Sequence, residues 1–440
     1  MEAETTTGED LRRIRQSLNI SEADIIGGGI EKDLLNLIES DATPLKTDDA
    51  KIICKSINKI LEERNMDLIV DVEDLLNPRR YEAKEKVEVY ISQLDKHRVE
   101  KDYVIDPDDL DDLEFLLNEY DLVDKKIKAY EVIGDIYFNS RDYEKEYEYM
   151  LKAWELRTRY PKRNQNYRIM IKLASNYIDR GKYEDVIRIY QNALLNAETI
   201  PNKYLIHIYY NYALAYYRLK MYSVSLEIIS DLLQYSMTKD YDLWRKTYIL
   251  EGVCYLEMGE YESALSSYTK ALQVITFTGY SDLKYLIYAN IAEVYTKLKD
   301  ENRAQQYIDG ILKDIDKLDK DGERYCKICH GLATVYESLD NLEKAVNYYK
   351  LSLEYASKNN QQNYILKNIT ALTELNTKIR VENIHTILEE YNSIIISNIN
   401  AYDGLLATFK SLKSYIQNKE YNGLEKLIDN IIKYQGGKSI

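Results

Sequence analysis

A repeat with a period of about 40 residues constrains the fold of this chain more than any other feature. A small residue followed three positions later by Tyr occurs six times, at Gly134, Ala174, Ala213, Gly252, Ala292 and Ala333. The spacings between successive small residues are 40, 39, 39, 40 and 41. An apolar or aromatic residue follows most of them by nine positions, at Tyr143, Tyr183, Tyr222, Tyr261 and Leu342. Such a period predicts a solenoid of helical hairpins, in which each hairpin buries its apolar face against its neighbours.

The repeats resemble tetratricopeptide repeats. The stretch GVCYLEMGEYESALSSYTKAL carries that family's small residue, its Tyr, its Gly-Tyr turn and its Ala positions. Six clear units are expected between about 127 and 358, a weaker pair at 364–396 and 402–434, and a degenerate hairpin at 81–121. The expected fold class is therefore all-α, with a tetratricopeptide-type α-solenoid over 127–440.

The first 77 residues differ from the repeats. GEDLRRIRQSL predicts a short helix, and Ser21 with Asp24 can form a capping box at the start of the next helix. Three glycines at 27–29 predict a turn before IEKDLLNLIES, and a further helix follows Pro44. This order is the helix-turn-helix layout. Pro78 is the expected boundary, followed at 78–126 by a linker and the degenerate hairpin.

Residues 1–77 resemble the XRE, or lambda-repressor-like, DNA-binding domain through Leu11, Arg12, Arg15 and the segment from Ile30 to Leu45. Such a domain joined to a tetratricopeptide array resembles the peptide-pheromone regulators of the RRNPP family. The resemblance implies a quorum-sensing-type transcription regulator of sporulation, virulence or competence. It also implies a homodimer that binds double-stranded operator DNA and a short signalling peptide.

The residues expected to contact DNA lie in the first helix and around the recognition helix. Lys32 and Asn36 are candidate base readers beside Glu31, which only a cytosine amino group would accept. Candidate phosphate contacts are Arg12, Arg13, Arg15 and Lys46. Residues 1–66 nevertheless carry 14 acidic and 9 basic side chains. The alternative is therefore a degenerate, non-DNA-binding domain on an interaction module that sequesters or regulates a response regulator or kinase.

The residues expected to bind the peptide recur at fixed repeat positions. Basic or titratable side chains recur six residues before the small residue of the repeat and form a column. Amide or basic side chains recur two residues before the same small residue. Asn can pair with a peptide backbone, and Lys or Arg can hold a carboxylate. The candidates are Lys128, Arg168, Lys172, His207, Tyr210, Asn211, Lys246, Asn290 and Lys327. For any one of them, solvation or gap filling is the alternative reading.

Other protein classes find little support in the sequence. The acidic N-terminus is unlike a signal peptide, and no 18-residue apolar run predicts a membrane span. Four scattered cysteines fit a reducing cytoplasm better than a disulfide framework. No P-loop or nucleophile motif predicts an enzyme, and no cofactor or metal site is expected, although Cys326 to His330 spells C-x-x-C-H.

Overall fold

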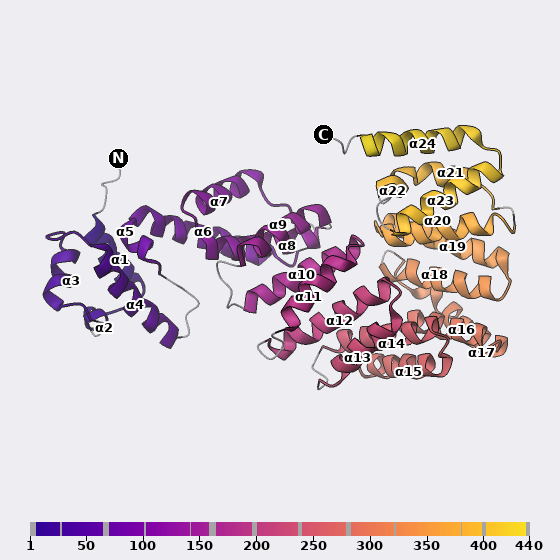
Figure 1. The fold of residues 1–440 in the computed structure, drawn as a ribbon, viewed down its shortest axis with the longest axis horizontal. Helices are drawn as coiled ribbons and strands as arrows, with labels where there is room; N and C mark the ends of the chain where they lie inside the picture. The colour runs from indigo at the N-terminus through magenta and orange to yellow at the C-terminus, as the bar shows by residue number, and fades with distance from the viewer. Residues whose placement is uncertain are drawn as a thin grey trace. The chain divides into compact units, whose positions relative to one another are not determined.

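The computed structural model describes residues 6–26, 29–64, 70–100, 103–140, 142–157, 164–195, 200–235, 240–278, 283–320, 323–379, 381–397 and 402–436. Within these ranges every regular element is a helix, which confirms the all-α prediction (Figure 1). The chain forms two compact units, 1–173 and 174–440. The division falls inside a repeat helix.

Five short helices form the N-terminal bundle: α1 (Thr7–Ser17), α2 (Glu22–Ile26), α3 (Lys32–Glu39), α4 (Thr47–Glu63) and α5 (Val72–Leu76). Leu11, Ile14, Leu35, Ile53 and Ile57 are fully buried in its core. These positions recur at helical spacing in α1, α3 and α4, which is why one face of each helix turns inward.

The start of α2 has the capping box expected from the sequence. The backbone N–H of Asp24 donates to Ser21 Oγ at 3.3 Å, and the backbone N–H of Ser21 donates to the Asp24 carboxylate at 2.9 Å. Gly29 follows α2 with a φ of +111°, a conformation that favours glycine. Gly27 and Gly28 of the expected turn lie outside the described residues.

A cluster of buried charges joins this bundle to the next helix, α6 (Pro78–His97). Asp74 is fully buried and pairs with Arg80 and with Lys84, whose ammonium lies 2.7 Å from its carboxylate. Arg80 also pairs with Asp71 at 3.2 Å and donates from Nε to the carbonyl of Tyr120. The expected linker therefore begins as a helix that is held to the bundle by ion pairs.

The rest of the first unit consists of hairpins. Helix α6 is followed by α7 (Pro107–Glu119), and then by α8 (Val123–Asn139) and α9 (Tyr143–Leu156). Helix α10 (Asn164–Asp179) contains the division between the two units.

The second unit continues the repeat. Its helices are α11 (Tyr183–Leu194), α12 (Asn202–Arg218), α13 (Tyr222–Leu233), α14 (Tyr241–Glu257), α15 (Tyr261–Thr278), α16 (Leu283–Lys297), α17 (Glu301–Leu312), η3 (Ile315–Lys317), α18 (Glu323–Ser338), α19 (Leu342–Lys358), α20 (Gln362–Leu375), α21 (Ile384–Glu390), α22 (Asn392–Ser397), α23 (Tyr402–Gln417) and α24 (Tyr421–Gly436). Successive hairpins lie side by side through this unit (Figure 1).

The small residues of the repeat mark close contacts between helices. A Cβ atom on Gly252 would lie 2.5 Å from the ring of Tyr268, and one on Gly134 would lie 2.5 Å from the Met150 methyl group. Ala213, Ala292 and Ala333 are fully buried at the equivalent positions. Close approach of the two helices of a hairpin therefore explains why the sequence repeats a small side chain there.

A residue in the left-handed conformation ends most first helices. Lys220, Gly259, Lys299 and Asp340 have φ values of 60°, 79°, 59° and 59°, each two residues before the second helix begins. The backbone N–H of the next residue then bonds back across the helix end, as from Glu260 to the carbonyl of Tyr255. This regular turn keeps the hairpins in one register.

No helix among the described ranges is both long and apolar enough to cross a membrane.

Candidate functional site

Helix α3 presents a polar face to solvent. Lys32 and Asn36 are exposed and lie one turn apart, whereas Leu35 and Ile38 on the opposite side are buried. Glu31 is exposed and precedes the helix without a side-chain capping bond. Lys46 is exposed at the start of α4. The side chains expected around a recognition helix are thus accessible, and three of them are basic or amide groups.

The three arginines of α1 have different surroundings. Arg12 is exposed and forms no ion pair with another described residue. Arg13 lies 3.1 Å from the carboxylate of Asp10 and 3.2 Å from that of Glu82. Arg15 is 6% exposed, and its Nε and Nη2 donate to the two carboxylate oxygens of Glu39 at 2.7 and 2.8 Å. The structure therefore gives Arg15 a role in the bundle core, and Arg12 remains available to a phosphate.

In the first unit, the predicted basic column is neutralised by carboxylates. Lys128 lies 2.6 Å from Glu88, and Arg168 lies 2.8 Å from Glu131. Lys172 pairs with Glu131 at 3.5 Å and also with Asp135. Glu131 is 1% exposed, whereas Lys128 and Glu88 are both accessible to solvent. Each of these three cations is paired with a carboxylate, which leaves little net charge for a ligand.

In the second unit the column is only partly paired. His207 lies 3.2 Å from Asp240, and Lys246 lies 2.7 Å from Asp242. Burial lowers the pKa of His207 below its ordinary value, against the opposing effect of Asp240. Lys327 has no carboxylate within ion-pair distance among the described residues, and its ammonium lies 5.9 Å from the ring centre of Tyr364. Lys327 is therefore the available cation of this column.

The two asparagines of the column also differ. Asn211 is 8% exposed and donates from Nδ2 to Tyr190 Oη at 3.2 Å and to Ser175 Oγ at 3.3 Å. Asn290 is half-buried, and its amide makes no hydrogen bond with the described part of the chain. Asn290 can therefore pair with a ligand, whereas the amide hydrogens of Asn211 are already engaged.

Burial also shifts the pKa of Tyr210, another of the candidates, and of a carboxyl group near it in the repeats. Tyr210 is half-buried, and burial raises the pKa of its hydroxyl to about 12, with Arg245 and Arg218 opposing the shift. Burial likewise raises the pKa of the Asp179 carboxyl, although Arg218 and Lys327 both act to lower it. Arg218 Nε is buried and has no hydrogen-bond partner within the described ranges. Residues of α10, α12 and α18 thus share one electrostatic environment.

Asp179 and Arg218 belong to a second column of charged residues, which sequence reasoning could have found. Asp179, Arg218, Glu257 and Lys297 each lie five residues after the small residue of their repeat. Their charges alternate in sign from one repeat to the next. Burial raises the pKa of Glu293, which lies within electrostatic range of both Glu257 and Lys297. Asp179, Glu257 and Lys297 are exposed and Arg218 is half-buried, so these charges are accessible to a ligand.

Helix α18 contains a buried imidazole. His330 Nδ1 lies 2.8 Å from Asn368 Oδ1, and Asn368 Nδ2 donates to Ser352 Oγ at 2.8 Å. Burial lowers the pKa of His330 to about 4. Since Asn368 donates its amide to Ser352, its oxygen accepts the Nδ1–H of His330, which fixes the imidazole tautomer. Cys326 and Cys329 are fully buried among the packed helices.

Comparison with known proteins agrees with the repeat assignment. The tetratricopeptide repeat family model matches residues 127–159, 246–275 and 327–359. These segments lie in the first, fourth and sixth of the six clear units. The tetratricopeptide architecture expected from the 40-residue period is thereby confirmed. No curated protein sequence matches the chain.

The solved structures to which the chain is similar include RRNPP-type proteins, the family that the sequence resembles. The apo form of the quorum sensor NprR from B. thuringiensis is 16% identical, with a TM-score of 0.48 over 87% of this chain and 99% of that one. Aspartyl phosphate phosphatase F from Bacillus subtilis is 14% identical, with a TM-score of 0.47 over 82% and 96%. PlcR from Bacillus thuringiensis, solved with the peptide PapR7 and DNA, is 18% identical, with a TM-score of 0.34 over 64% and 98%.

Proposed function

We propose that this chain is a peptide-responsive transcription regulator. Its second unit binds a short extended peptide along the first helices of the repeats, and its N-terminal bundle binds operator DNA. The observation that carries the peptide half is a set of unsatisfied polar groups on these helices: the Asn290 amide, the Lys327 ammonium and Arg218 Nε.

These groups suit an extended peptide chemically. An extended backbone presents unpaired N–H and C=O groups, and a side-chain amide can both donate to and accept from them. Arg218 and Lys327 can hold a carboxylate in a partly desolvated place, where such a pair is stronger than in water. Half-buried tyrosines such as Tyr210, Tyr209 and Tyr217 provide apolar walls with polar tips.

The test begins with a random heptapeptide library selected on the purified chain, followed by calorimetric titration of a selected synthetic peptide. We expect Asn290→Ala to weaken its binding and Asn302→Ala, an exposed asparagine on α17, to leave it unchanged. Equal affinity of the peptide for wild type and both variants, or no enrichment of any peptide, would contradict the receptor assignment.

The DNA half of the proposal is supported by α3, whose exposed Lys32 and Asn36 stand on one face of a helix that follows a tight turn. The rival function is a protein-interaction module, favoured by the acidic balance of residues 1–66. Selection of duplexes from a random pool, followed by gel shift, separates the two. Enrichment of one sequence supports operator binding, and no enrichment with or without the peptide supports the rival.

A homodimer forms part of the proposal because apolar side chains gather on the C-terminal helices. Six large apolar residues are more than 40% exposed on α23 and α24: Leu405, Phe409, Ile416, Tyr421, Ile428 and Ile432. Phe409→Glu is expected to give monomers by light scattering, and Phe138→Glu, an equally exposed residue of α8, is expected to leave the dimer intact. A wild-type monomer, or a dimeric Phe409→Glu variant, would contradict this interface.

A further inference from the structure

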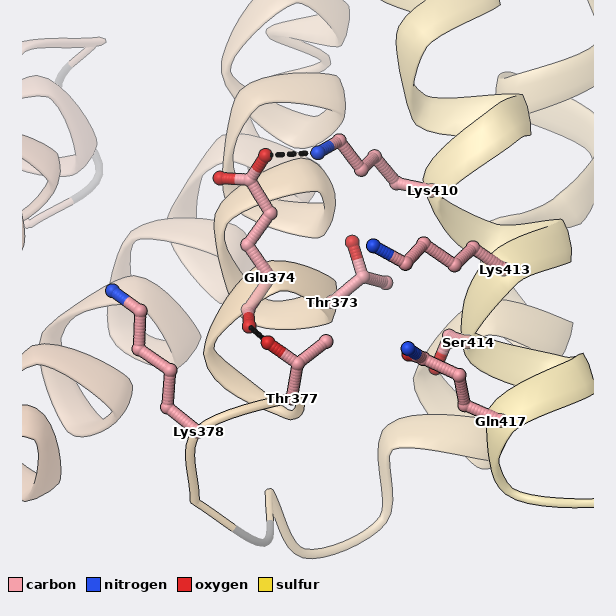
Figure 2. Close-up of a pocket in the computed structure, with 8 residues that line it drawn as sticks. All are labelled: Thr373, Glu374, Thr377, Lys378, Lys410, Lys413, Ser414 and Gln417. Atoms are coloured by element: carbon pink, nitrogen blue, oxygen red, sulfur yellow. Dashed lines mark hydrogen bonds and ion pairs between the residues drawn. The ribbon is translucent and has the colours of Figure 1, made fainter.

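A pocket lies between α23 and the C-terminal end of α20 (Figure 2). Its cavity measures about 230 Å³, and every residue that lines it has a polar side chain: Thr373, Glu374, Thr377, Lys378, Lys410, Lys413, Ser414 and Gln417. None of them is among the peptide-binding candidates. The space between packed helices is normally filled by side chains. A polar cavity of this size can hold a small ionic group together with a few waters.

The pocket concentrates positive charge in a chain with a net charge of −15. Three lysines stand against one carboxylate, Glu374, which pairs with Lys410. The nearest carboxylate to Lys378 is Glu337 at 3.5 Å, outside the pocket, and both groups are partly solvated. Such a pair contributes little.

Lys413 is the cation that these carboxylates do not balance. Its ammonium has no ion-pair partner among the residues that the structure describes, and it extends from α23 toward α20 between Lys410 and Gln417 (Figure 2). An unpaired ammonium beside two further lysines favours a bound counter-ion.

The remaining donors lie on the same face of α23. Lys410, Lys413, Ser414 and Gln417 follow the spacing of residues that share one side of a helix. Ser414 is 2% exposed; its Oγ accepts from Asn418 at 3.4 Å and donates to no described acceptor. Gln417 makes no hydrogen bond with the described part of the chain. Hydroxyl, amide and ammonium groups thus offer hydrogens to one small space.

On the other side, Thr373 of α20 and Thr377 just beyond its end donate their hydroxyl hydrogens to the carbonyls of Thr370 and Glu374. Their own oxygens can accept from a water or from a ligand hydroxyl group. The pocket therefore combines donors on one side with hydroxyl acceptors on the other.

We propose that this pocket binds a small oxyanion, a phosphoryl or carboxylate group, held by Lys413 with Ser414 and Gln417. Ammonium, hydroxyl and amide donors suit the several acceptor oxygens of either group. The site is distinct from the proposed peptide site, and its occupancy does not depend on peptide or DNA binding.

Equilibrium dialysis of the full chain with radiolabelled inorganic phosphate, and separately with radiolabelled glutarate, tests the proposal. Ionic strength is fixed with sodium chloride because screening alters any charge-driven binding. We expect one of the two probes to bind saturably at one site per chain. A phosphate preference identifies a phosphoryl ligand and a glutarate preference a carboxylate ligand; no saturation with either overturns the proposal.

Variants that each remove one charge test whether lysines strengthen binding and the carboxylate weakens it. Lys413→Met is expected to weaken binding at least about tenfold, and Glu374→Gln to strengthen it severalfold because the one anionic group is removed. Lys433→Met is the matched control, since Lys433 stands near the C-terminal end of α24, outside the pocket. Binding that falls equally in Lys413→Met and Lys433→Met would mean that the lysines act only through general charge, and would overturn the site.

Discussion

Arg15 and Glu39 form a buried ion pair that joins the first and third helices of the N-terminal bundle. Two nitrogens of the guanidinium meet the two carboxylate oxygens at 2.7 and 2.8 Å, and the Glu39 side chain raises the pKa of Arg15 above its ordinary value. Arg15 Nη1 also donates to the carbonyl of Ile20. Arg15, one of the four candidate phosphate contacts, therefore holds the loop before α2.

Removing either member of this pair is expected to destabilise the bundle. Arg15→Met leaves a buried carboxylate without its partner, which costs about 3–5 kcal/mol. Arg12→Met, at an exposed position three residues earlier, is the control and should cost little. Urea unfolding followed by circular dichroism measures both, and equal stability of the two variants would contradict a structural role for the pair.

The two residues proposed to contact DNA are expected to act in different ways. Arg12→Ala should weaken binding to all duplexes and reduce the slope of log K against log salt by about one unit. Asn36→Ala should cost about 1–3 kcal/mol on the selected operator and little on unrelated DNA. Fluorescence anisotropy over a salt series distinguishes them; identical effects on operator and unrelated DNA would exclude base reading by Asn36.

Substitutions of the two repeat asparagines, Asn211 and Asn290, are expected to differ: the first should affect stability and the second peptide binding. Asn211→Ala removes the amide that donates to Tyr190 Oη and should lower the free energy of unfolding by about 1–3 kcal/mol. Asn290→Ala should leave the free energy of unfolding unchanged and weaken binding of the selected peptide by a similar amount. Denaturant unfolding and calorimetry on the same preparations decide this, and a destabilised Asn290→Ala variant would place that amide in the fold.

His330 should make stability depend on pH between about 4 and 6.5. Its folded-state pKa is about 4, below the ordinary value of 6.5, because burial disfavours the imidazolium. The unfolded chain therefore binds more protons in this window, so stability is complete above pH 6.5 and falls as the pH drops toward 4, by up to about 3 kcal/mol. His330→Gln keeps a side-chain amide beside Asn368 and should show a weaker dependence in thermal unfolding across this range. An unchanged pH slope would mean that His330 titrates as it does in the unfolded chain.

Local periodicity was sufficient to predict the hairpins. The helices α9, α11, α13, α15 and α19 begin at Tyr143, Tyr183, Tyr222, Tyr261 and Leu342, the positions that the spacing indicated. These boundaries depend on contacts within one hairpin and on the turn before it, so a short window of sequence contains them. In the weak C-terminal repeat the pattern fades, and the expected second helix is divided into α21 and α22.

The candidate site was harder to predict because its pairings cross repeats. Nothing near Lys172 in the sequence shows that Glu131 and Asp135, on the preceding first helix, neutralise it. Likewise, Arg15 and Glu39 are separated by 24 residues, and the exposure of neither follows from its own helix alone. Burial and charge balance at these positions depend on how helices stack, which a single-helix pattern does not encode.

The charge cluster of Asp71, Asp74, Arg80 and Lys84 connects the N-terminal bundle to the hairpin that follows it. Arg80 pairs with Asp74 at the end of the bundle and donates to the carbonyl of Tyr120 at the end of α7, so one residue contacts both parts. A small tilt of the α6–α7 hairpin would then move α3 as well. Ion pairs and a hydrogen bond at this connection pass such a rotation on more directly than a flexible linker would.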